Sequence, residues 1–257
     1  MIYINKSYLY GNKKNAQVLC NYQREIKLIK RLIDISEKAV NYQEPTNTWS
    51  YEGVCHLFAK DIVDYSKMAF DNLILGNFRG TKMINRTVLE NLVCLDLIVH
   101  NDELWKYYLV YSYRNVIYKL NHIPTDLELD RLEGLYEVYD ISEDFYIKQK
   151  GRRKAYIKEP YGWTYKINDT KQFTFEKMCN LIGEDSEYKG YKMLSDYSHG
   201  TSLYMKIHGL NFMENIISMY VDMYINLFRM VMMYCDDFED EEFADVTDEL
   251  ECIFQNI

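Results

Sequence analysis

Apolar residues recur every three or four positions along most of the chain, which is the spacing of one face of an α-helix. The segment that ends at Val99 is apolar on nearly all sides, as is typical of a helix buried in a core. The pattern predicts an all-α, single-domain bundle of about eight or nine helices. We expect them at 16–41, 50–75, from Gly76 or Gly80 to 99, and at 104–120, 124–149, 175–182, 186–199, 210–234 and 239–254.

Local signals place two of the helix starts. Asn101 is the expected N-cap of the helix at 104–120. Thr125 and Glu128 have the spacing of a capping box, in which each side chain binds the backbone amide of the other residue.

Residues 150–172 interrupt the helical pattern. Gly151, Pro160 and Gly162 fall in this segment, and polarity alternates with period two from Trp163 to Ile167. We interpret the segment as an irregular basic loop or a small hairpin that turns near residues 159–162.

The segment 210–234 is long and apolar enough to span a bilayer. Polar residues nevertheless recur along it at steps of three and four, and they include an Asp and an Arg near its middle, where lipid would disfavour them. We therefore expect a central bundle helix, with no membrane contact, whose polar stripe comprises Asn215, Ser218, Asp222, Asn226 and Arg229.

The net charge of −9 comes from the C-terminus. Residues 236–251 hold ten acids and no Lys or Arg; without them, 29 acids face 30 bases. We expect a bundle domain at 1–235, followed at 236–257 by an acidic tail or helix. This acidic segment could contact a partner protein or the basic loop of this chain at 150–172.

Composition agrees with a helical intracellular protein. Three prolines and eleven glycines favour long helices over many turns. The six cysteines form no CxxC motif, which favours buried thiols in a reducing compartment. With no apolar stretch of signal-peptide length at the N-terminus, we expect a cytoplasmic location.

Arg86 and Glu90 form the first candidate site, because residues four apart share one face of a helix. Charges in so apolar a helix must be paired. The pair is either a structural ion pair or a site that binds an anionic substrate.

Ser195 and His199 form the second candidate, on one face of the helix expected at 186–199 and in line with Tyr191. Gly200 ends this helix, and the helix dipole favours a charged His199. His199 is either a helix cap or a general acid–base; a Ser–His nucleophile pair would need a third group to orient it.

A basic segment with aromatic neighbours forms the third candidate. Cationic side chains together with rings suit single-stranded nucleic acid, although a solvated loop has the same composition. Its predicted binding residues are Lys150, Arg152, Arg153, Lys154 and Trp163.

Several common motifs are absent from the sequence. There is no GxGxxG or GxxxxGK[ST] and no GxSxG. There is also no HExxH and no cluster of His, Cys and Asp with ligand spacing. We therefore expect no cofactor and no metal site.

Together these motifs resemble a prokaryotic domain-of-unknown-function family (number 5677) over roughly residues 50–235. They are Arg86-x3-Glu90, a loop with Trp163, a short helix ended by Gly183, and Tyr191-x3-Ser195-x3-His199-Gly200 before a long helix. The resemblance implies an all-α fold in which Arg, Glu, Ser and His meet from two distant helices, and it brings no established activity.

A looser analogy connects small helical bacterial domains with defence and toxin systems, including HEPN-type ribonucleases. Those enzymes carry an Arg followed four to six residues later by His. The nearest spacing here, Arg114 to His122, is longer and departs from that pattern.

The leading hypothesis is a bacterial or phage-related defence or stress protein that cleaves RNA phosphodiesters without a metal. In it, His199 acts as general acid–base, Arg86 stabilises the phosphate, Glu90 orients one of them and Ser195 completes the pocket. The alternatives are a non-catalytic helical sensor or interaction module and an inhibitor whose acidic tail mimics nucleic acid. A homodimer through an apolar helix face is compatible with all three.

Overall fold

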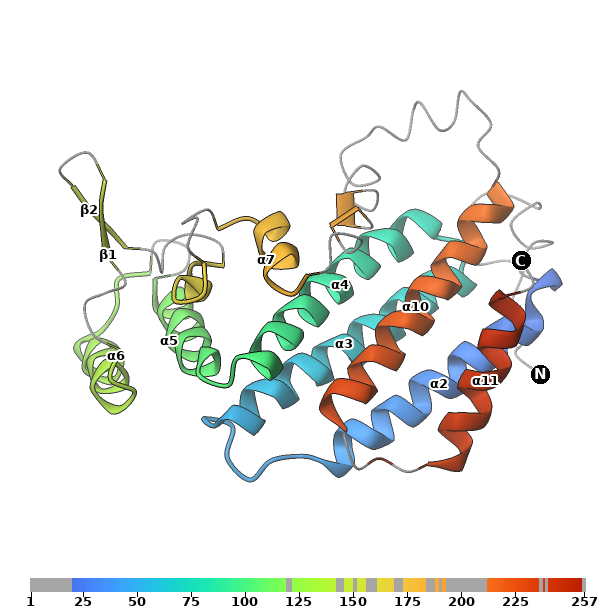
Figure 1. Cartoon of the computed structure of the whole chain (residues 1–257), viewed down its shortest axis with the longest axis horizontal. Coiled ribbons are helices and arrows are strands. Elements are labelled where there is room, and N and C mark those ends of the chain that lie inside the picture. The colour runs from blue at the N-terminus through green and yellow to red at the C-terminus, as the bar shows by residue number, and fades with distance from the viewer. Residues whose placement is uncertain are drawn as a thin grey trace. The chain divides into compact units, whose positions relative to one another are not determined.

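A computed structural model describes residues 20–118, 122–141, 146–149, 152–155, 161–168, 173–183, 188–189, 191–192, 212–235, 238 and 240–255. These residues contain eight α-helices and one two-stranded hairpin, which confirms the predicted all-α class (Figure 1). The chain divides into two compact units. We call them the bundle unit (Met1–Glu44, His56–Leu95 and Lys189–Ile257) and the small unit (Pro45–Cys55 and Asp96–Tyr188).

Five helices build the bundle unit. They are α2 (Gln23–Tyr42), most of α3 (Tyr51–Ile74) and of α4 (Phe78–His100), α10 (Phe212–Tyr234) and α11 (Glu241–Phe254). Helix α2 packs against both α10 and α11, and α10 also contacts α11. The helices run side by side in Figure 1, so each can bury an apolar face among its neighbours.

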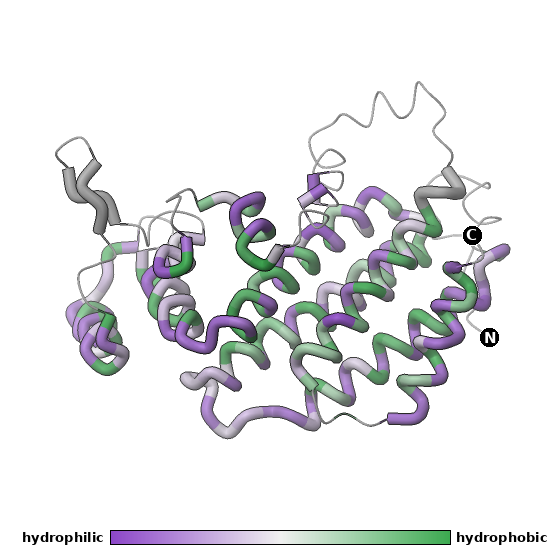
Figure 2. Tube along the Cα trace, in the orientation of Figure 1, coloured by the Kyte–Doolittle hydropathy of each residue, from purple (hydrophilic) through white to green (hydrophobic). Residues whose placement is uncertain are grey.

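The amphipathic pattern of α2 explains its place in the bundle. Ile26, Ile29, Leu32 and Ile33 are all fully buried, whereas Arg24 and Arg31 on other faces are exposed. Figure 2 shows the corresponding alternation of hydrophobic and hydrophilic positions along the helix. Burial of the apolar stripe, rather than helix propensity, supplies most of the stability of such a helix.

The turn between α3 and α4 shows where the third predicted helix begins. Gly76 has a φ of 75°, a left-handed conformation that ends a helix and that glycine adopts without strain. Asn77 then accepts a hydrogen bond from the Gly80 amide at 3.1 Å, and α4 starts at Phe78. The Thr81 hydroxyl donates to the Ala69 carbonyl at 3.2 Å and joins the two helices.

Asn101 does not cap the following helix as predicted. Its side-chain amide donates to the Leu97 carbonyl at 3.0 Å, so it stabilises the C-terminal end of α4 instead. Helix α5 (Leu104–Ile117) starts after Glu103, whose side chain forms no capping hydrogen bond. The amide of asparagine can donate as well as accept, and here its donor is used.

In the small unit, α5 contacts α6 (Asp126–Val138) and the 3₁₀-helix η5 (Gly162–Thr164). Its core is a small cluster of Val110, Ile117, Leu132 and Ile141, surrounded by tyrosine rings. The predicted capping box of Thr125 and Glu128 is present. Helix α6 ends at Val138, eleven residues before the predicted end, and Asp140 follows in a left-handed conformation with a φ of 49°.

The predicted hairpin lies earlier in the chain than the sequence suggested. Strand β1 (Tyr146–Gln149) pairs antiparallel with β2 (Arg152–Ala155). Tyr161 has a left-handed φ of 58° and leads into η5, so the alternating segment that begins at Trp163 starts as a 3₁₀ turn instead of a strand. The short helix α7 (Phe175–Leu181) lies where it was predicted. Of the helix expected at 186–199, the structure describes residues 188–189 and 191–192, all of them helical.

Candidate functional site

Helix α4 carries polar side chains into the interior of the bundle unit. Lys82 is 2% exposed and Asn85 is 1% exposed, at positions where the helical period requires a buried side chain. Arg86 and Glu90 continue this polar line toward the edge of the helix and are half-buried. Buried polar groups are costly unless something pairs with them, so each of these residues calls for a partner.

Arg86 contacts both Glu90 and Tyr191. Its Nη2 lies 3.5 Å from Glu90 Oε1, and it also donates a hydrogen bond to the hydroxyl of Tyr191. The guanidinium carbon is 4.4 Å from the centre of the Tyr191 ring, within the range of a cation–π contact. Residues 105 positions apart in the chain therefore meet in one cluster, which we call the Arg86 cluster.

The surroundings of Tyr191 raise the pKa of its hydroxyl. Burial raises the pKa of its hydroxyl, and the hydrogen bond and negative charge of Glu90 raise it further, while Arg86 acts in the opposite direction. The phenol thus keeps its proton across the physiological pH range, since its ordinary pKa is already about 10. In this state it can donate a hydrogen bond to an anion but is a poor general base.

The buried Lys82 interacts with Asp222 on α10. Burial lowers the pKa of the Lys82 ammonium group to about 8, and the nearby Asp222 carboxylate partly offsets that effect. Asp222 belongs to the polar stripe of α10, and Asn226 of the same stripe is buried. The stripe predicted from the sequence therefore meets the polar line of α4 inside the bundle unit.

Asn85 differs from its neighbours on α4. Neither its side-chain nitrogen nor its side-chain oxygen has a hydrogen-bond partner, although both are buried. An unsatisfied buried amide costs about 1–3 kcal/mol. Such strain is uncommon in native proteins and often marks a site that serves something other than stability.

The structure answers part of the site prediction. Arg86 and Glu90 lie in contact, and the first residue of the Tyr191-x3-Ser195-x3-His199 sequence touches Arg86. Ser195 and His199 lie outside the described residues. Three further interior polar residues, Lys82 and Asn85 of α4 and Asp222 of α10, were not among the predicted site residues. Polar positions three and four apart in an apolar helix were the available signal.

The predicted nucleic-acid segment is only partly described. Arg152, Arg153 and Lys154 lie in strand β2, whereas Lys150 lies outside the described residues. Trp163 is 1% exposed and packs edge-on against Tyr108, with 5.3 Å between the ring centres. It therefore presents no ring face to a nucleic acid, contrary to the prediction; its apolar surface is used in the core of the small unit.

The acidic C-terminal segment folds as α11 instead of extending as a tail. Phe243, Val246 and Leu250 form its buried face. Glu249 pairs with Arg24 at 2.6 Å, and Glu242 pairs with Arg31 at 3.1 Å. Among the described residues, both of these basic partners belong to α2.

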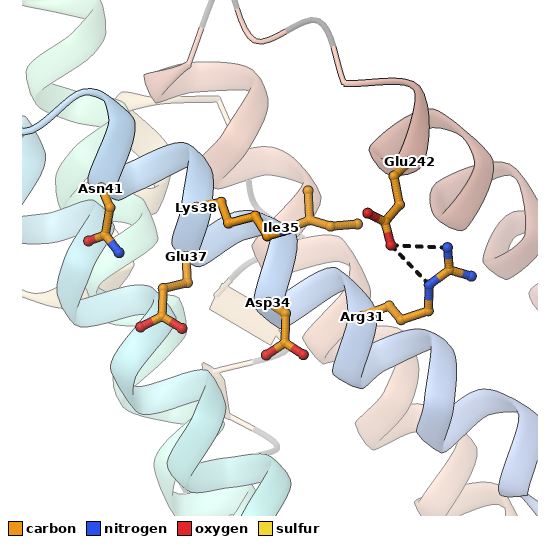
Figure 3. A pocket seen from close by; sticks show the side chains of 7 residues that line it. All are labelled: Arg31, Asp34, Ile35, Glu37, Lys38, Asn41 and Glu242. Atoms are coloured by element: carbon orange, nitrogen blue, oxygen red, sulfur yellow. Dashed lines mark hydrogen bonds and ion pairs between the residues drawn. The ribbon is translucent and has the colours of Figure 1, made fainter.

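A groove of about 520 Å³ lies beside the second of these ion pairs (Figure 3). Six of its seven lining residues come from one face of α2, and Glu242 of α11 reaches across to Arg31. The lining residues carry charges of both signs and are separate from the Arg86 cluster: Arg31, Asp34, Ile35, Glu37, Lys38, Asn41 and Glu242.

Two further features bear on the class of protein. Among the described residues, no three His, Cys, Asp or Glu side chains are grouped so that they could hold a metal ion. In the same part of the chain, Ile216–Tyr234 of α10 is long and apolar enough to cross a membrane, and half of that segment is buried inside the protein. The contacts of α10 with α2 and α11 are those expected of a central bundle helix.

Fold and site together define an all-α protein with a charged cluster inside a helical bundle. A family model, described as a family of unknown function (DUF5677), matches residues 52–214. The chain belongs to this family. The match includes α4 and Tyr191, and therefore both segments of the Arg86 cluster, but neither α2 nor α11. No curated protein and no solved structure matches the chain.

Proposed function

We propose that the Arg86 cluster is part of a site that binds an RNA phosphate and cleaves the phosphodiester without a metal, in a cytoplasmic defence or stress protein. The contact between Arg86 and Tyr191 is the observation that carries the proposal. It brings a half-exposed cation next to the start of the segment that contains Ser195 and His199.

The chemistry assigns a separate task to each group. His199 is the proposed general base, which takes the proton of the ribose 2′-hydroxyl as that oxygen attacks phosphorus. The bond from phosphorus to the 5′-oxygen breaks, a 2′,3′-cyclic phosphate forms, and the leaving 5′-oxygen takes a proton from water. Arg86 and the protonated Tyr191 donate hydrogen bonds to the phosphate oxygens, where negative charge increases in the transition state. Glu90 orients Arg86.

The test uses the purified full-length chain and end-labelled RNA oligonucleotides of varied sequence, in buffer with EDTA. We expect cleavage that His199→Ala abolishes and that Arg86→Ala reduces by a factor of about 100 or more. Arg79→Ala is the matched control, since Arg79 is an exposed arginine on the same helix. A 2′-deoxy nucleotide at the cleaved position should block the reaction, since it removes the attacking oxygen.

Two results would contradict the proposal: no cleavage of any RNA by the wild-type chain, or an Arg86→Ala variant as active as the Arg79→Ala control. Melting temperatures of all variants show whether a loss of activity reflects unfolding. An active-site His199 predicts that His199→Ala stays within a few degrees of the wild type.

A non-catalytic sensor or interaction module is the second candidate. It is favoured by the extent to which the cluster is already paired, since Arg86 contacts both Glu90 and Tyr191, and Asp222 offsets the charge of Lys82. In this case the polar groups specify packing, and His199→Ala should lower the melting temperature markedly while no RNA is cleaved.

A further inference from the structure

Helix α10 is apolar on nearly all sides, yet only one side of it is buried. Half of the apolar segment Ile216–Tyr234 lies inside the protein, where α10 packs against α2 and α11. On the side opposite to these contacts, Ile225 is 41% exposed and Met232 is 56% exposed. A bundle helix that is covered on one side only is expected to be polar on the other, so this face calls for an explanation.

The exposed side of α10 carries a continuous row of four apolar residues. They follow one another at steps of four, three and four, with Val221 and Phe228 half-buried, and we call them the α10 stripe: Val221, Ile225, Phe228 and Met232. The stripe is about 16 Å long. Phe228 stacks on Phe243 of α11, with 6.0 Å between the ring centres, and so joins one edge of the stripe to the bundle. Single exposed apolar residues are ordinary, whereas an unbroken row marks an interaction surface.

Two opposite charges border the α10 stripe along its other edge. Asp222 and Arg229 are seven residues apart, so they lie on the same side of the helix, two turns from each other. Both side chains are half-buried. Asp222 also interacts with Lys82 of α4, which identifies this border as the edge of the stripe nearest to α4. The border therefore has an acid toward the start of the helix and a base toward its end.

This arrangement is complementary to itself. A two-fold axis at the midpoint of the stripe places a second α10 antiparallel to the first, with Val221 opposite Met232 of the second copy and Ile225 opposite Phe228. The same rotation keeps the two charged borders on one side. Asp222 then lies within two residues, or about 3 Å along the axis, of Arg229 of the second copy, and the contact occurs twice. A parallel pair would place the two borders on opposite sides and form neither contact.

We infer that the α10 stripe is the contact face of a homodimer in which two copies of α10 pack antiparallel. Charge complementarity selects the second copy as the occupant, because each Asp222 meets an Arg229. A carboxylate accepts more than one hydrogen bond, so Asp222 can contact Lys82 and Arg229 of the second copy together. A lipid surface would fit the apolar row but not the two charges beside it, which are costly in a membrane. One pair of short stripes buries less than a standard interface, so we expect a dissociation constant on the order of micromolar.

The inference is independent of RNA cleavage, because α10 contains no residue of the proposed catalytic site. It is tested by sedimentation equilibrium of the full-length chain at concentrations around the expected dissociation constant. We expect a reversible monomer–dimer equilibrium in the wild type. Circular dichroism melting of every variant shows whether a loss of the dimer reflects unfolding.

Ile225→Glu and Met232→Glu should each raise the dissociation constant at least about 10-fold, because each puts a charge into the apolar contact. Arg229→Asp should raise it as well, since it brings another carboxylate next to Asp222 of the second copy. Two substitutions control for the added charge and should leave the equilibrium unchanged. They are Met68→Glu, at a half-exposed methionine of α3, and Lys38→Glu, at an exposed lysine of α2.

Three results would overturn the inference. The first is a wild-type chain that stays monomeric even far above micromolar concentration. The second is a dimer that neither Ile225→Glu nor Met232→Glu weakens, or one that Arg229→Asp leaves unchanged, since the antiparallel contact requires all three residues. The third is binding of the monomer to phosphatidylcholine vesicles that Ile225→Glu abolishes, which would make a lipid surface the occupant of the stripe.

Discussion

Helices α4 and α6 break the usual partition of residues in opposite ways. Helix α4 holds Lys82 and Asn85 inside the bundle unit, where apolar residues are expected. Helix α6 holds Leu127 and Val138 outside, where polar residues are expected. Both arrangements cost free energy relative to the ordinary pattern.

The difference teaches where to look for function in a chain of this kind. A buried polar line can select a ligand or hold a reactive group, because charges act strongly away from water. Single apolar side chains in water are ordinary on protein surfaces and by themselves mark no function. The buried polar line of α4 is therefore the better guide to a functional site.

The largest expected effect follows from removing Asp222. Asp222→Ala should lower the free energy of unfolding by about 3 kcal/mol at pH 7, since it leaves the buried Lys82 ammonium without its nearby carboxylate. Chemical denaturation measures the change. Asp245→Ala, at an exposed acid of α11, is the control, and Lys82→Met combined with Asp222→Leu should recover most of the loss. A loss below about 1 kcal/mol would show that α4 tolerates an unpaired charge.

The pH dependence of stability gives the next effect. The pKa of Lys82 is about 8 in the folded chain and about 10.4 when unfolded, so between pH 8 and 10 the unfolded chain binds more protons. Stability contributed by this group therefore rises with pH across that window, by about 2 kcal/mol. The rise should disappear in Lys82→Met when both proteins are denatured at a series of pH values. Parallel curves for the two proteins would argue against a buried lysine.

Asn85→Leu should have a smaller effect, of opposite sign to that of Asp222→Ala. It replaces a buried amide that has no partner with an apolar group of similar size, so the melting temperature should rise, by the equivalent of about 1 kcal/mol. Differential scanning calorimetry measures the shift. Destabilisation by a similar amount would mean that the amide is satisfied in solution by a bound molecule.

The smallest effect is expected on α6. Leu127→Ser and Val138→Ser should each change the free energy of unfolding by no more than about 0.5 kcal/mol, because both side chains already lie in water. Urea titration of the isolated protein provides the measurement. A cost above about 1 kcal/mol would place these side chains in a packed interface and weaken the contrast with α4.

Hydrophobic periodicity was sufficient to predict where most helices lie, but not the conformation of the segments between them. The limits of α3 and α7 fall within about one residue of the prediction, since repeated apolar positions and clear breaks define them. The hairpin was misplaced because alternation over five residues is equally compatible with a 3₁₀ turn that buries Trp163. The end of α6 was missed because it depends on the left-handed conformation of Asp140, which has no strong sequence signal.

The candidate site was only partly accessible from sequence for a different reason. Arg86 and Glu90 are four residues apart, so local geometry was enough to pair them. The contact of Arg86 with Tyr191 and the approach of Lys82 to Asp222 join segments more than one hundred residues apart. Spacing along a chain contains no information about such contacts, which depend on tertiary packing.

The ion pairs between α2 and α11 also constrain how the chain can fold. Arg24 and Glu249 are 225 positions apart, so α2 leaves the ribosome well before the helix with which it pairs. Contacts this distant require a long loop to close and form late in folding. The part of α2 that receives α11 therefore stays uncovered until α11 has also been made, and during that interval the new chain is most open to chaperones and to aggregation.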